Sequence, residues 1–563
     1  MTVTQDWRSK VSQPRHGMTV HRGIMIRSRD GTRLACDVYV PDRPGRYPAL
    51  LSYSHYGKDL QRVTGKRAPL SPLLGNGGLE AGDSEYFVSR GYVHVIADAR
   101  GSGDSEGEYC YQGPKEQEDG YDIIEWMAAQ PWCDGNCGML GMSYFAVMQY
   151  MVAAQQPPHL KAIVPYEALT DRYRQSVYHG GLLNEGFWHQ WWGHVSVDGM
   201  TPLSYARLPQ EEIDRRVAAL MESPEVRHSA YLHIQLKYPR KNPLLFDWLL
   251  EPFDGPFYWE RSPYCMFDRI RIPTFLVTRW TSWAVHLAGA FQAYEGIDAP
   301  KKLLVMETPS RLGPLRPWTD HHDLILRWYD HWLKGNDTGF MDEPPIELLI
   351  KGKDEYRFEN EWPLARTRWT RLYLGPGGTL SATQPAQSGE AQFHNDPDLP
   401  PGQLPPAVTF TTEPFAADFE VTGPVAFTFH ATLDQSDATW VATLRDVAPD
   451  GTSRTLTKGW LRASQRELDE EKSRPYRPWQ KHTRKEALRP GQSYAYAMEI
   501  REVSNLFRAG YCLALDIRGQ DSTAEDPIWV HTCNGVRTRH SVRFGGSFES
   551  FLLLPVIPEK GDK

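Results

Sequence analysis

Residues 130–144 read QPWCDGNCGMLGMSY, and this stretch decides the fold. Its second half predicts a short apolar strand and a sharp turn at Gly141-Met142-Ser143, and the FAVMQYMVAA that follows predicts a helix. A serine on such a turn projects its hydroxyl above the carboxyl edge of a sheet, where N–H groups of the next helix can stabilise an oxyanion. Phe145 stands where the G-x-S-x-G pattern has its second glycine, so the surrounding sequence has to support the motif.

Strands and helices alternate on both sides of this turn. Apolar, β-rich runs at residues 47–57, 91–98 and 160–166 are separated by helical runs, which predicts a largely parallel sheet covered on both faces. From residue 171 the sequence becomes helical and rich in aromatic residues. Beyond residue 353 it consists of short strands with period-2 alternation and Gly-Gly or Pro-Asp-Gly turns, which predicts an antiparallel jelly roll. We therefore expect an α/β core at residues 1–170 and 264–353, an inserted helical cap at 171–263 and a jelly-roll β-sandwich at 354–563.

The composition is that of an ordinary globular protein. Hydrophobic residues make up 40% of the chain and charged residues 23%. The length of 563 residues predicts two to four domains. No apolar run approaches the ~20 residues of a membrane span, and the polar N-terminus does not resemble a secretory signal. The net charge of −8 gives no general attraction to nucleic acid or to anionic lipid. Seven scattered cysteines suggest free thiols in a reducing compartment, so we expect a cytoplasmic protein.

Further segments carry a resemblance to a known family. ADARGSGDSEGEY at 97–109 is similar to a D-x-R-G-x-G-x-S-x-G motif, and QPWCDGNCGMLGMSY to a W-C-x-G-x-x-G-x-x-G-x-S-Y motif. Residues 326–352 and 410–432 resemble the segment that joins two domains and the start of a jelly-roll core. These motifs belong to the superfamily of cocaine esterase, α-amino-acid ester hydrolases and X-prolyl dipeptidyl-peptidases. The resemblance implies an α/β-hydrolase domain with an inserted helical cap and a C-terminal jelly roll, with Ser143 as nucleophile.

The resemblance also implies an oxyanion hole. In this family a tyrosine on the loop after an early strand binds the oxyanion, and Tyr56 in Ser54-His55-Tyr56-Gly57-Lys58 is the matching residue. Its partner would be the backbone N–H of Tyr144. Each good donor supplies roughly 3 kcal/mol of transition-state stabilisation.

Two positions depart from the family pattern. The family's acid lies in a motif like G-W-Y-D, and here Ser282 occupies its place. The family's histidine lies in a motif like G-P-W-S-H, and here Arg311 stands where the base should be. Arginine stays protonated and a serine hydroxyl cannot stabilise an imidazolium, so neither residue can do the lost task.

Three accounts are consistent with these changes. In the first, the triad is rebuilt: Glu167 follows the strand at 160–166 and could orient a histidine, for which His286, His322 and His55 are the candidates. In the second, the oxyanion hole polarises a carbonyl for a lyase, cyclase or dehydratase reaction without an acyl-enzyme. In the third, the chain binds a ligand and catalyses nothing.

The expected substrate is a hydrophobic small molecule or a short peptide with an ester or amide carbonyl. The cap segment at 187–192, FWHQWW, places aromatic rings over the pocket, so Trp188, Trp191 and Trp192 are candidate substrate-binding residues. Trp280, Arg311 and His55 are further candidates because they adjoin predicted catalytic positions. An acidic cluster that captures a peptide amino terminus could come from Glu167, Asp171 or Glu185. We expect no metal or other cofactor, since no ligand set, nucleotide loop or flavin motif occurs. A homodimer is the candidate assembly.

Overall fold

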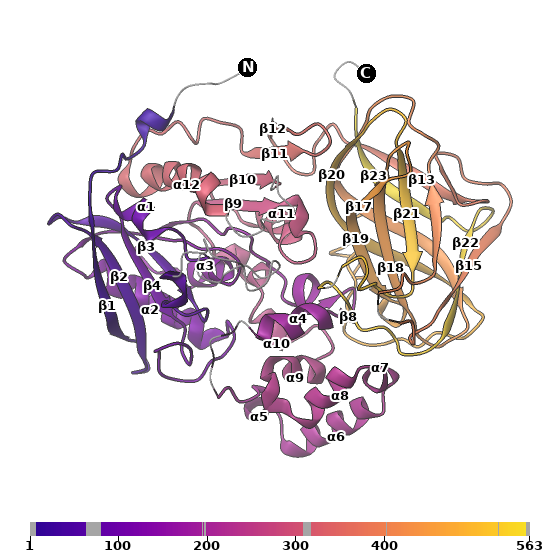
Figure 1. The fold of residues 1–563 in the computed structure, drawn as a ribbon, viewed down its shortest axis with the longest axis horizontal. Helices are drawn as coiled ribbons and strands as arrows, with labels where there is room; N and C mark the ends of the chain where they lie inside the picture. Colours follow the sequence, from indigo (N-terminus) through magenta and orange to yellow (C-terminus); the bar gives the residue numbers. More distant parts are fainter. Residues whose placement is uncertain are drawn as a thin grey trace.

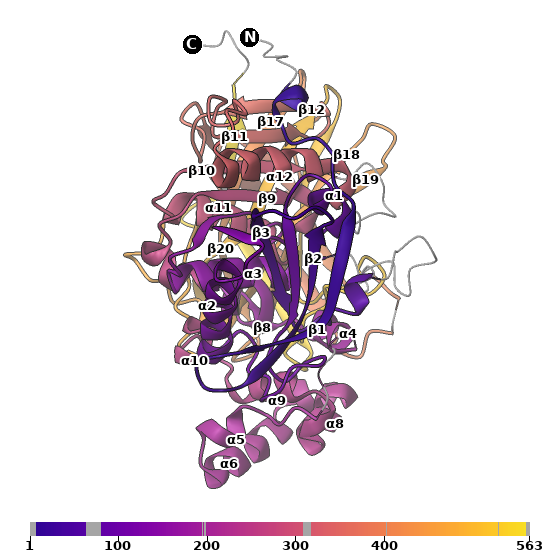
Figure 2. The same ribbon diagram turned by 90° about the vertical axis from the view of Figure 1, so that its left-hand side faces the viewer.

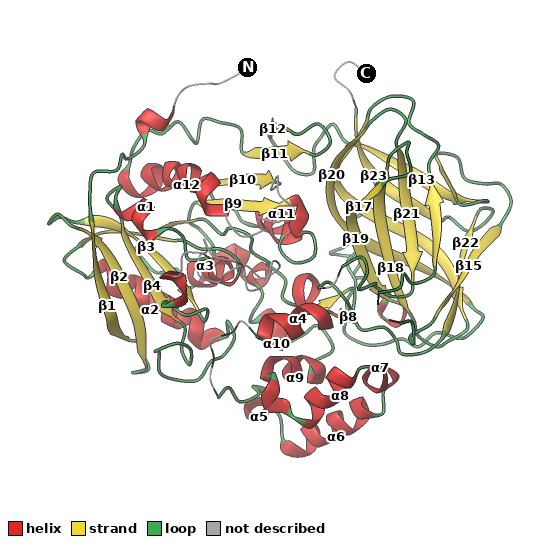
Figure 3. Ribbon diagram, in the orientation of Figure 1, coloured by secondary structure: helices red, strands yellow, loops and turns green. Residues whose placement is uncertain are grey.

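The computed structural model describes residues 7–62, 80–193, 195, 197, 199–307, 317–400, 402–526 and 528–558. An α/β part and an all-β part lie side by side, and a group of helices projects below them (Figure 1). The same division is visible when helices and strands are coloured separately (Figure 3). The predicted class of fold is confirmed. In the described part of the chain, no helix is long and apolar enough to cross a membrane.

A mixed sheet forms the centre of the α/β part. The pairs that join β3, β4, β5, β6, β9, β10 and β11 are parallel, and the outer pairs at both edges are antiparallel. β1 and β2 lie at one edge of this twisted sheet (Figure 2). In sheet order, the strands are β1 (Met18–Arg27), β2 (Arg33–Pro41), β4 (Val93–Asp98), β3 (Tyr47–Ser54), β5 (Cys133–Met139), β6 (Leu160–Ile163), β9 (Thr274–Arg279), β10 (Lys301–Met306), β11 (Ile346–Ile350) and β12 (Glu355–Glu359).

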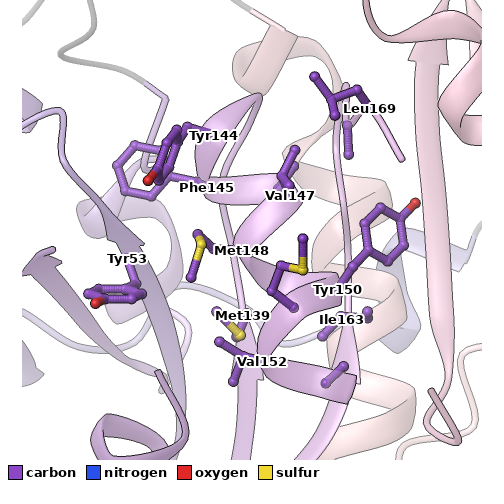
Figure 4. Packing of buried hydrophobic residues seen from close by; sticks show 14 of the residues in the cluster. Tyr53, Met139, Tyr144, Phe145, Val147, Met148, Tyr150, Val152, Ile163 and Leu169 are labelled. Carbon is purple, nitrogen blue, oxygen red and sulfur yellow. The ribbon is translucent and has the colours of Figure 1, made fainter. Parts of the chain in front are cut away.

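Helices cover this sheet, so strands in its interior are buried from end to end. Every residue of β4 and β9 is buried. Every residue of α3 is buried as well, and Figure 4 shows its side chains Met148 and Val152 near Met139 of β5. The α/β part contains α1 (Ser84–Val88), α2 (Pro114–Ala128), α3 (Tyr144–Ala154), α11 (Leu287–Gly296) and α12 (Pro317–Lys334). Burying the large apolar side chains of α3 stabilises the fold by ~2 kcal/mol each.

The helical insertion lies between β6 and β9 along the chain. Two short strands, β7 (Tyr178–His179) and β8 (Leu182–Leu183), precede its helices. The helices are α4 (Glu185–Trp192), α5 (Ser204–Arg207), α6 (Gln210–Met221), α7 (Pro224–His228), α8 (Ala230–Lys237), α9 (Pro243–Leu250) and α10 (Pro256–Trp259). Trp188 and Trp191 of α4 are buried, so this helix holds the insertion against the α/β part.

The all-β part is one antiparallel-rich sheet that folds around its own core. Phe427, Phe429 and Trp440 are fully buried there. The Pro-Asp-Gly turn predicted between two strands joins β18 to β19, with Gly451 at φ +84° where a side chain would be strained. The strands are β13 (Arg368–Gly375), β14 (Thr379–Ser381), β15 (Gly389–Asn395), β16 (Ala407–Thr411), β17 (Phe419–Leu433), β18 (Thr439–Val447), β19 (Ser453–Arg462), β20 (Ser493–Phe507), β21 (Cys512–Arg518), β22 (Thr538–Phe544) and β23 (Phe551–Ile557).

The expected domain boundaries stay predictions, but one strand lies beyond its expected part. β12 at Glu355–Glu359 pairs antiparallel with β11, so the first sheet continues past residue 353, where we expected the jelly roll to begin. The sequence of β12, EYRFE, alternates between aromatic and charged residues like the jelly-roll strands that follow. Only its pairing with β11 shows that it belongs to the first sheet.

Candidate active site

The turn before α3 holds Ser143 in an unusual backbone conformation. Ser143 has φ +59° and ψ −115°, a region that residues with a side chain rarely adopt. Gly141 has φ +136°, and a Cβ at this position would lie 2.3 Å from Cβ of Phe145. Position 141 therefore has to be glycine, because the first side-chain atoms of residue 145 approach it too closely for a Cβ. The serine is presented on a sharp strand-to-helix turn, as expected of a nucleophile elbow.

Three neighbouring strand ends bring the functional side chains together. Beyond the regular strands, Met142, Tyr166 and Val277 form parallel bridges. The Ser143 N–H donates to the Tyr166 carbonyl oxygen at 3.1 Å, and the Glu167 N–H donates to the Val277 carbonyl oxygen at 2.7 Å. Because β5, β6 and β9 are parallel, the residues after them reach the same carboxyl edge of the sheet. This register places Glu167 beside Ser143.

His286 completes a row of three groups at this edge. It lies on the loop after β9, where its N–H donates to the Ser282 carbonyl oxygen at 3.0 Å, and it directly precedes α11. Its Nε2 is 3.4 Å from Ser143 Oγ, and its Nδ1 is 3.4 Å from Glu167 Oε2. Trp283, three residues earlier, stacks on Trp460 of β19 with ring centroids 5.7 Å apart, so the all-β part supports this loop.

Glu167 is buried and charged at neutral pH. Its Oε2 accepts from Arg279 Nη2 at 2.8 Å and from Ser282 Oγ at 2.5 Å. Burial raises the pKa of Glu167, but the charge of Arg279 and the hydrogen bond and charge of His286 lower it further, leaving a net value below the ordinary range. Ser282, at the position of the family's acid, thus donates a hydrogen bond to a carboxylate supplied by the neighbouring strand.

Tyr56 lies in the same pocket as Ser143 and is held by the cap. The indole N–H of Trp191 donates to Tyr56 Oη at 3.0 Å. Burial raises the pKa of Tyr56 far above its ordinary value, so the phenol stays protonated. With Trp191 on its oxygen, the phenol retains its own proton to donate. Tyr144 is the first residue of α3, and its N–H belongs to the first turn, which has no intrahelical acceptor.

Behind the oxyanion side of the pocket lies a buried polar network. Tyr144 Oη donates to Glu116 Oε1 at 2.7 Å and accepts from Tyr109 Oη at 3.1 Å. Nδ1 of His55 is 3.1 Å from Tyr109 Oη, and its ring lies 4.4 Å from the ring of Tyr56. Burial lowers the pKa of His55 well below its ordinary value. The structure therefore places His55 behind Tyr56, where it supports the tyrosines.

The pocket above Ser143 is small and rich in aromatic side chains. Its empty space measures about 310 Å³, part of it open solvent. The lining residues are Tyr56, Tyr111, Gln112, Ser143, Tyr144, Val147, Leu169, Arg172, Ser176, Phe187, Trp188, Trp191, Val285 and His286. Trp188 and Trp191 thus lie where the sequence places an acyl site, at the roof formed by α4.

Three other sequence candidates lie elsewhere, and a fourth cannot be placed. His322 of α12 is buried between the rings of Tyr86 and Phe87, at centroid distances of 4.7 and 5.5 Å, and does not line the pocket. Trp280 is buried, and its indole N–H donates to the Leu349 carbonyl oxygen at 2.8 Å, so it packs in the core. Trp192 is half-buried on α4 outside the pocket lining. Arg311 lies outside the described residues.

The expected acidic cluster does not form at the pocket. Asp171 pairs with Arg174 at 3.0 Å, and Glu185 Oε1 accepts from Ser229 Oγ at 2.5 Å. Sequence reasoning missed Arg279, Arg172 and Gln112. Arg279 is a charged residue at the end of a buried strand, and this could have marked it as the partner of a buried carboxylate.

Comparisons with known proteins agree with this architecture. A model described as X-Pro dipeptidyl-peptidase (S15 family) matches residues 30–309, and one described as the X-Pro dipeptidyl-peptidase C-terminal non-catalytic domain matches residues 338–553. The chain is 27% identical to cocaine esterase of Rhodococcus sp., over 96% of this chain and 99% of that protein.

Solved structures show the same fold. A CocE/NonD family hydrolase from Staphylococcus aureus has a TM-score of 0.77 at 24% identity, covering 96% of this chain and 94% of that one. An α-amino acid ester hydrolase has a TM-score of 0.75 at 19% identity, covering 99% and 100%. With both family models matched in the expected order, the chain belongs to the serine-hydrolase superfamily that contains cocaine esterase and the X-Pro dipeptidyl-peptidases.

Proposed function

We propose that this chain hydrolyses an ester or amide of a small hydrophobic acyl group through a rebuilt triad of Ser143, His286 and Glu167. The observation that carries the proposal is the row of three groups, in which His286 lies 3.4 Å from both Ser143 Oγ and Glu167 Oε2. Catalytic hydrogen bonds are often this long before a substrate binds. The acid and the base thus come from positions other than those of the family motifs.

The acylation step uses all three groups. Ser143 Oγ attacks the carbonyl carbon while His286 Nε2 takes the hydroxyl proton, and the imidazolium donates through Nδ1 to Glu167. The carbonyl oxygen becomes an oxyanion, which accepts from the Tyr56 hydroxyl and the Tyr144 N–H. The imidazolium then gives its proton to the leaving alcohol or amine, and the carbon–oxygen or carbon–nitrogen bond breaks.

Deacylation repeats the sequence with water. His286 takes a proton from a water molecule, the resulting hydroxide attacks the acyl carbon, and the same two donors hold the oxyanion. Ser143 leaves with the proton returned by His286. Glu167 remains a carboxylate throughout, because Arg279 and Ser282 hold its charged form.

The position of His286 favours hydrolysis over the other two accounts. Lyase chemistry and a purely binding role were suggested by the absence of a base at residue 311. A histidine that reaches Ser143 Oγ supplies that base, and a serine on a strained turn with an adjacent oxyanion site is typical of a nucleophile.

The test is covalent labelling combined with isotope incorporation. A fluorophosphonate probe, in which serine displaces fluoride from phosphorus, should label wild-type protein once, at Ser143, as read by intact mass and peptide mapping. Ser143→Ala and His286→Ala should remove labelling, and His21→Ala, which changes an exposed histidine on β1, should keep it. Hydrolysis of a 4-nitrophenyl benzoate in heavy-oxygen water should place one heavy oxygen in the benzoic acid.

The outcomes separate the three accounts. Labelling that persists in His286→Ala would reject His286 as the base. Absence of labelling in folded wild-type protein, together with turnover that lacks the heavy oxygen, would favour lyase chemistry. Ligand binding without any turnover that depends on Ser143 would favour a binding role.

A further inference from the structure

The charged residue Arg172 lines the pocket above Ser143, and the described part of the chain supplies no carboxylate partner for it. Its side chain is only 3% exposed, and among the described residues no Asp or Glu forms an ion pair with it. Arginine is almost never buried unless it is paired, because an isolated buried charge is costly. Arg174, two residues further on, shows the usual arrangement, since it pairs with Asp171 at 3.0 Å and Asp254 at 2.8 Å.

The contacts of Arg172 hold it in place without neutralising it. One Nη donates to Gln112 Oε1, the other lies 3.5 Å from Ser176 Oγ, and the guanidinium lies 4.9 Å from the ring centre of Tyr111. All of these partners are uncharged. They fix the plane of the guanidinium and leave its positive charge available to the pocket.

Further polar atoms around the same pocket lack hydrogen-bond partners within the described structure. They are Nε of Arg172, Nε2 of Gln112 and the hydroxyl of Tyr111, all buried. Buried polar groups are normally satisfied, so a cluster of such groups in one pocket points to a ligand that satisfies them. The three groups can all donate, which favours a ligand rich in acceptor oxygens.

The loop that carries two of these groups is strained. Tyr111 has φ +48° and Gln112 has φ +57°, although neither is glycine. Gln112 is anchored through its backbone N–H, which donates to Glu116 Oε2 at 2.7 Å and to Tyr144 Oη at 3.1 Å. The loop is thereby built into the polar network behind the oxyanion site, so its side chains face the pocket in a fixed geometry.

We infer that the acyl group of the substrate, otherwise hydrophobic, carries one carboxylate, which Arg172 binds together with Gln112 and Tyr111. This inference rests on the proposed function and adds the chemical class of the substrate. A planar carboxylate matches the fork of a guanidinium and offers several acceptor sites. A phosphate is disfavoured, because its second charge would have no further Lys or Arg among the described residues of the pocket lining. The substrate would thus be a half-ester or half-amide of a diacid.

The experiment compares matched esters. The 4-nitrophenyl esters of 3- and 4-carboxybenzoic acid are paired with those of 3- and 4-carbamoylbenzoic acid, which have the same shape without the charge. The rigid ring prevents the carboxylate from reaching its own ester. Wild-type protein should prefer one carboxyl ester over its carbamoyl counterpart by about tenfold to 100-fold in kcat/KM, the range for charge-assisted hydrogen bonds.

Two variants test whether Arg172 causes the preference. Arg172→Met removes the charge and should abolish the preference. Gln112→Glu places a carboxylate of the protein beside Arg172 with almost no change of shape, so it should also abolish or invert the preference and keeps the test valid if Arg172→Met does not fold. Arg215→Met, which removes an exposed arginine of α6, should keep the wild-type ratio.

The results distinguish this inference from the proposed function. Equal turnover of charged and neutral esters through Ser143, or an unchanged ratio in both variants, would overturn the inference and leave the proposed function intact. If no ester is hydrolysed through Ser143, the proposed function fails. Calorimetric titration of Ser143→Ala with benzoate and benzamide then decides: benzoate binding that Arg172→Met removes supports a carboxylate site, and its absence rejects one.

Discussion

Replacing Glu167 with glutamine should separate the catalytic role of this residue from its structural role. The change keeps the size of the side chain and removes its charge. The amide oxygen can take the place of Oε2, where it accepts from Ser282 and His286, and the amide nitrogen then lies near Thr278 Oγ1, which is 3.4 Å from Oε1. The geometry of the site is therefore largely kept.

Two magnitudes follow from the lost charge. Arg279 is 5% exposed and lies 2.8 Å from Glu167, so the variant leaves a buried guanidinium without its carboxylate, which costs about 3 kcal/mol of folding stability. The imidazolium that forms on His286 during acylation loses its counter-charge, which should lower kcat by about 10³-fold to 10⁴-fold, the effect of the same change in other triads. KM should change little, because Glu167 does not line the pocket.

The assay measures ester turnover and urea unfolding for Glu167→Gln, for Arg279→Gln and for the double variant. The double variant removes the buried guanidinium together with the carboxylate, so it should recover part of the stability that Glu167→Gln loses, but it should stay inactive. Glu80→Gln, which changes a nearby carboxyl outside the row of three groups, serves as the matched control for activity. If Glu167→Gln kept more than about a tenth of the wild-type kcat, the carboxylate would not support the base and the triad would be wrong.

Other changes give equally definite expectations. Tyr56→Phe should lower kcat by about 10²-fold to 10³-fold with little effect on KM, since it removes one oxyanion donor; steady-state kinetics that showed a KM effect alone would contradict this role. Gly141→Ala should destabilise the fold by about 3 kcal/mol in urea unfolding, because its Cβ would lie 2.3 Å from Phe145 Cβ at φ +136°; wild-type stability would show that the turn can relax. Burial and the charge of Glu167 raise the pKa of Glu80 from its ordinary 4.5 to about 8. A raised acid pKa means that the folded state binds more protons, so the free energy of unfolding should fall as the pH rises from 4.5 through 8, by ~2 kcal/mol after allowing for solvent relaxation. Glu80→Gln should remove most of this fall in unfolding measured at pH values of about 5 and 9, and an unchanged slope would refute the assignment.

The sequence was sufficient for the fold and for naming Ser143 and Tyr56, which line the same pocket in the structure. Hydrophobic periodicity can be read from a single sequence. It marks the alternating strands and helices, the inserted helices and the late antiparallel strands. Ser143 and Tyr56 sit in motifs whose spacing is local. Glu167 could be named from the sequence because it directly follows a buried strand, and strand ends in a parallel sheet meet at one edge.

The choice among histidines needed the three-dimensional structure. His286 and His322 both stand near the start of a helix after a strand, and the sequence treats them alike. The two histidines differ in where the surrounding chain places them. The loop after β9 brings His286 to the edge of the sheet, whereas α12 directs His322 towards Tyr86. Arg172 was missed for a related reason, since only the packing of the loop at Tyr111 and Gln112 shows that it is buried with no acidic partner among the residues that the structure describes.

The contact between Ser282 and Glu167 bears on how inactive relatives are recognised. Residue 282 follows one strand and residue 167 the next strand of the sheet, yet their side-chain oxygens lie 2.5 Å apart. A carboxylate on either strand therefore occupies nearly the same point in space, although 115 positions separate the two in the chain. A search that requires an acid at 282 and a histidine at 311 would count this protein among the pseudoenzymes. A search that compares the positions of side chains in space would instead find a serine, a histidine and a carboxylate together at the edge of its sheet.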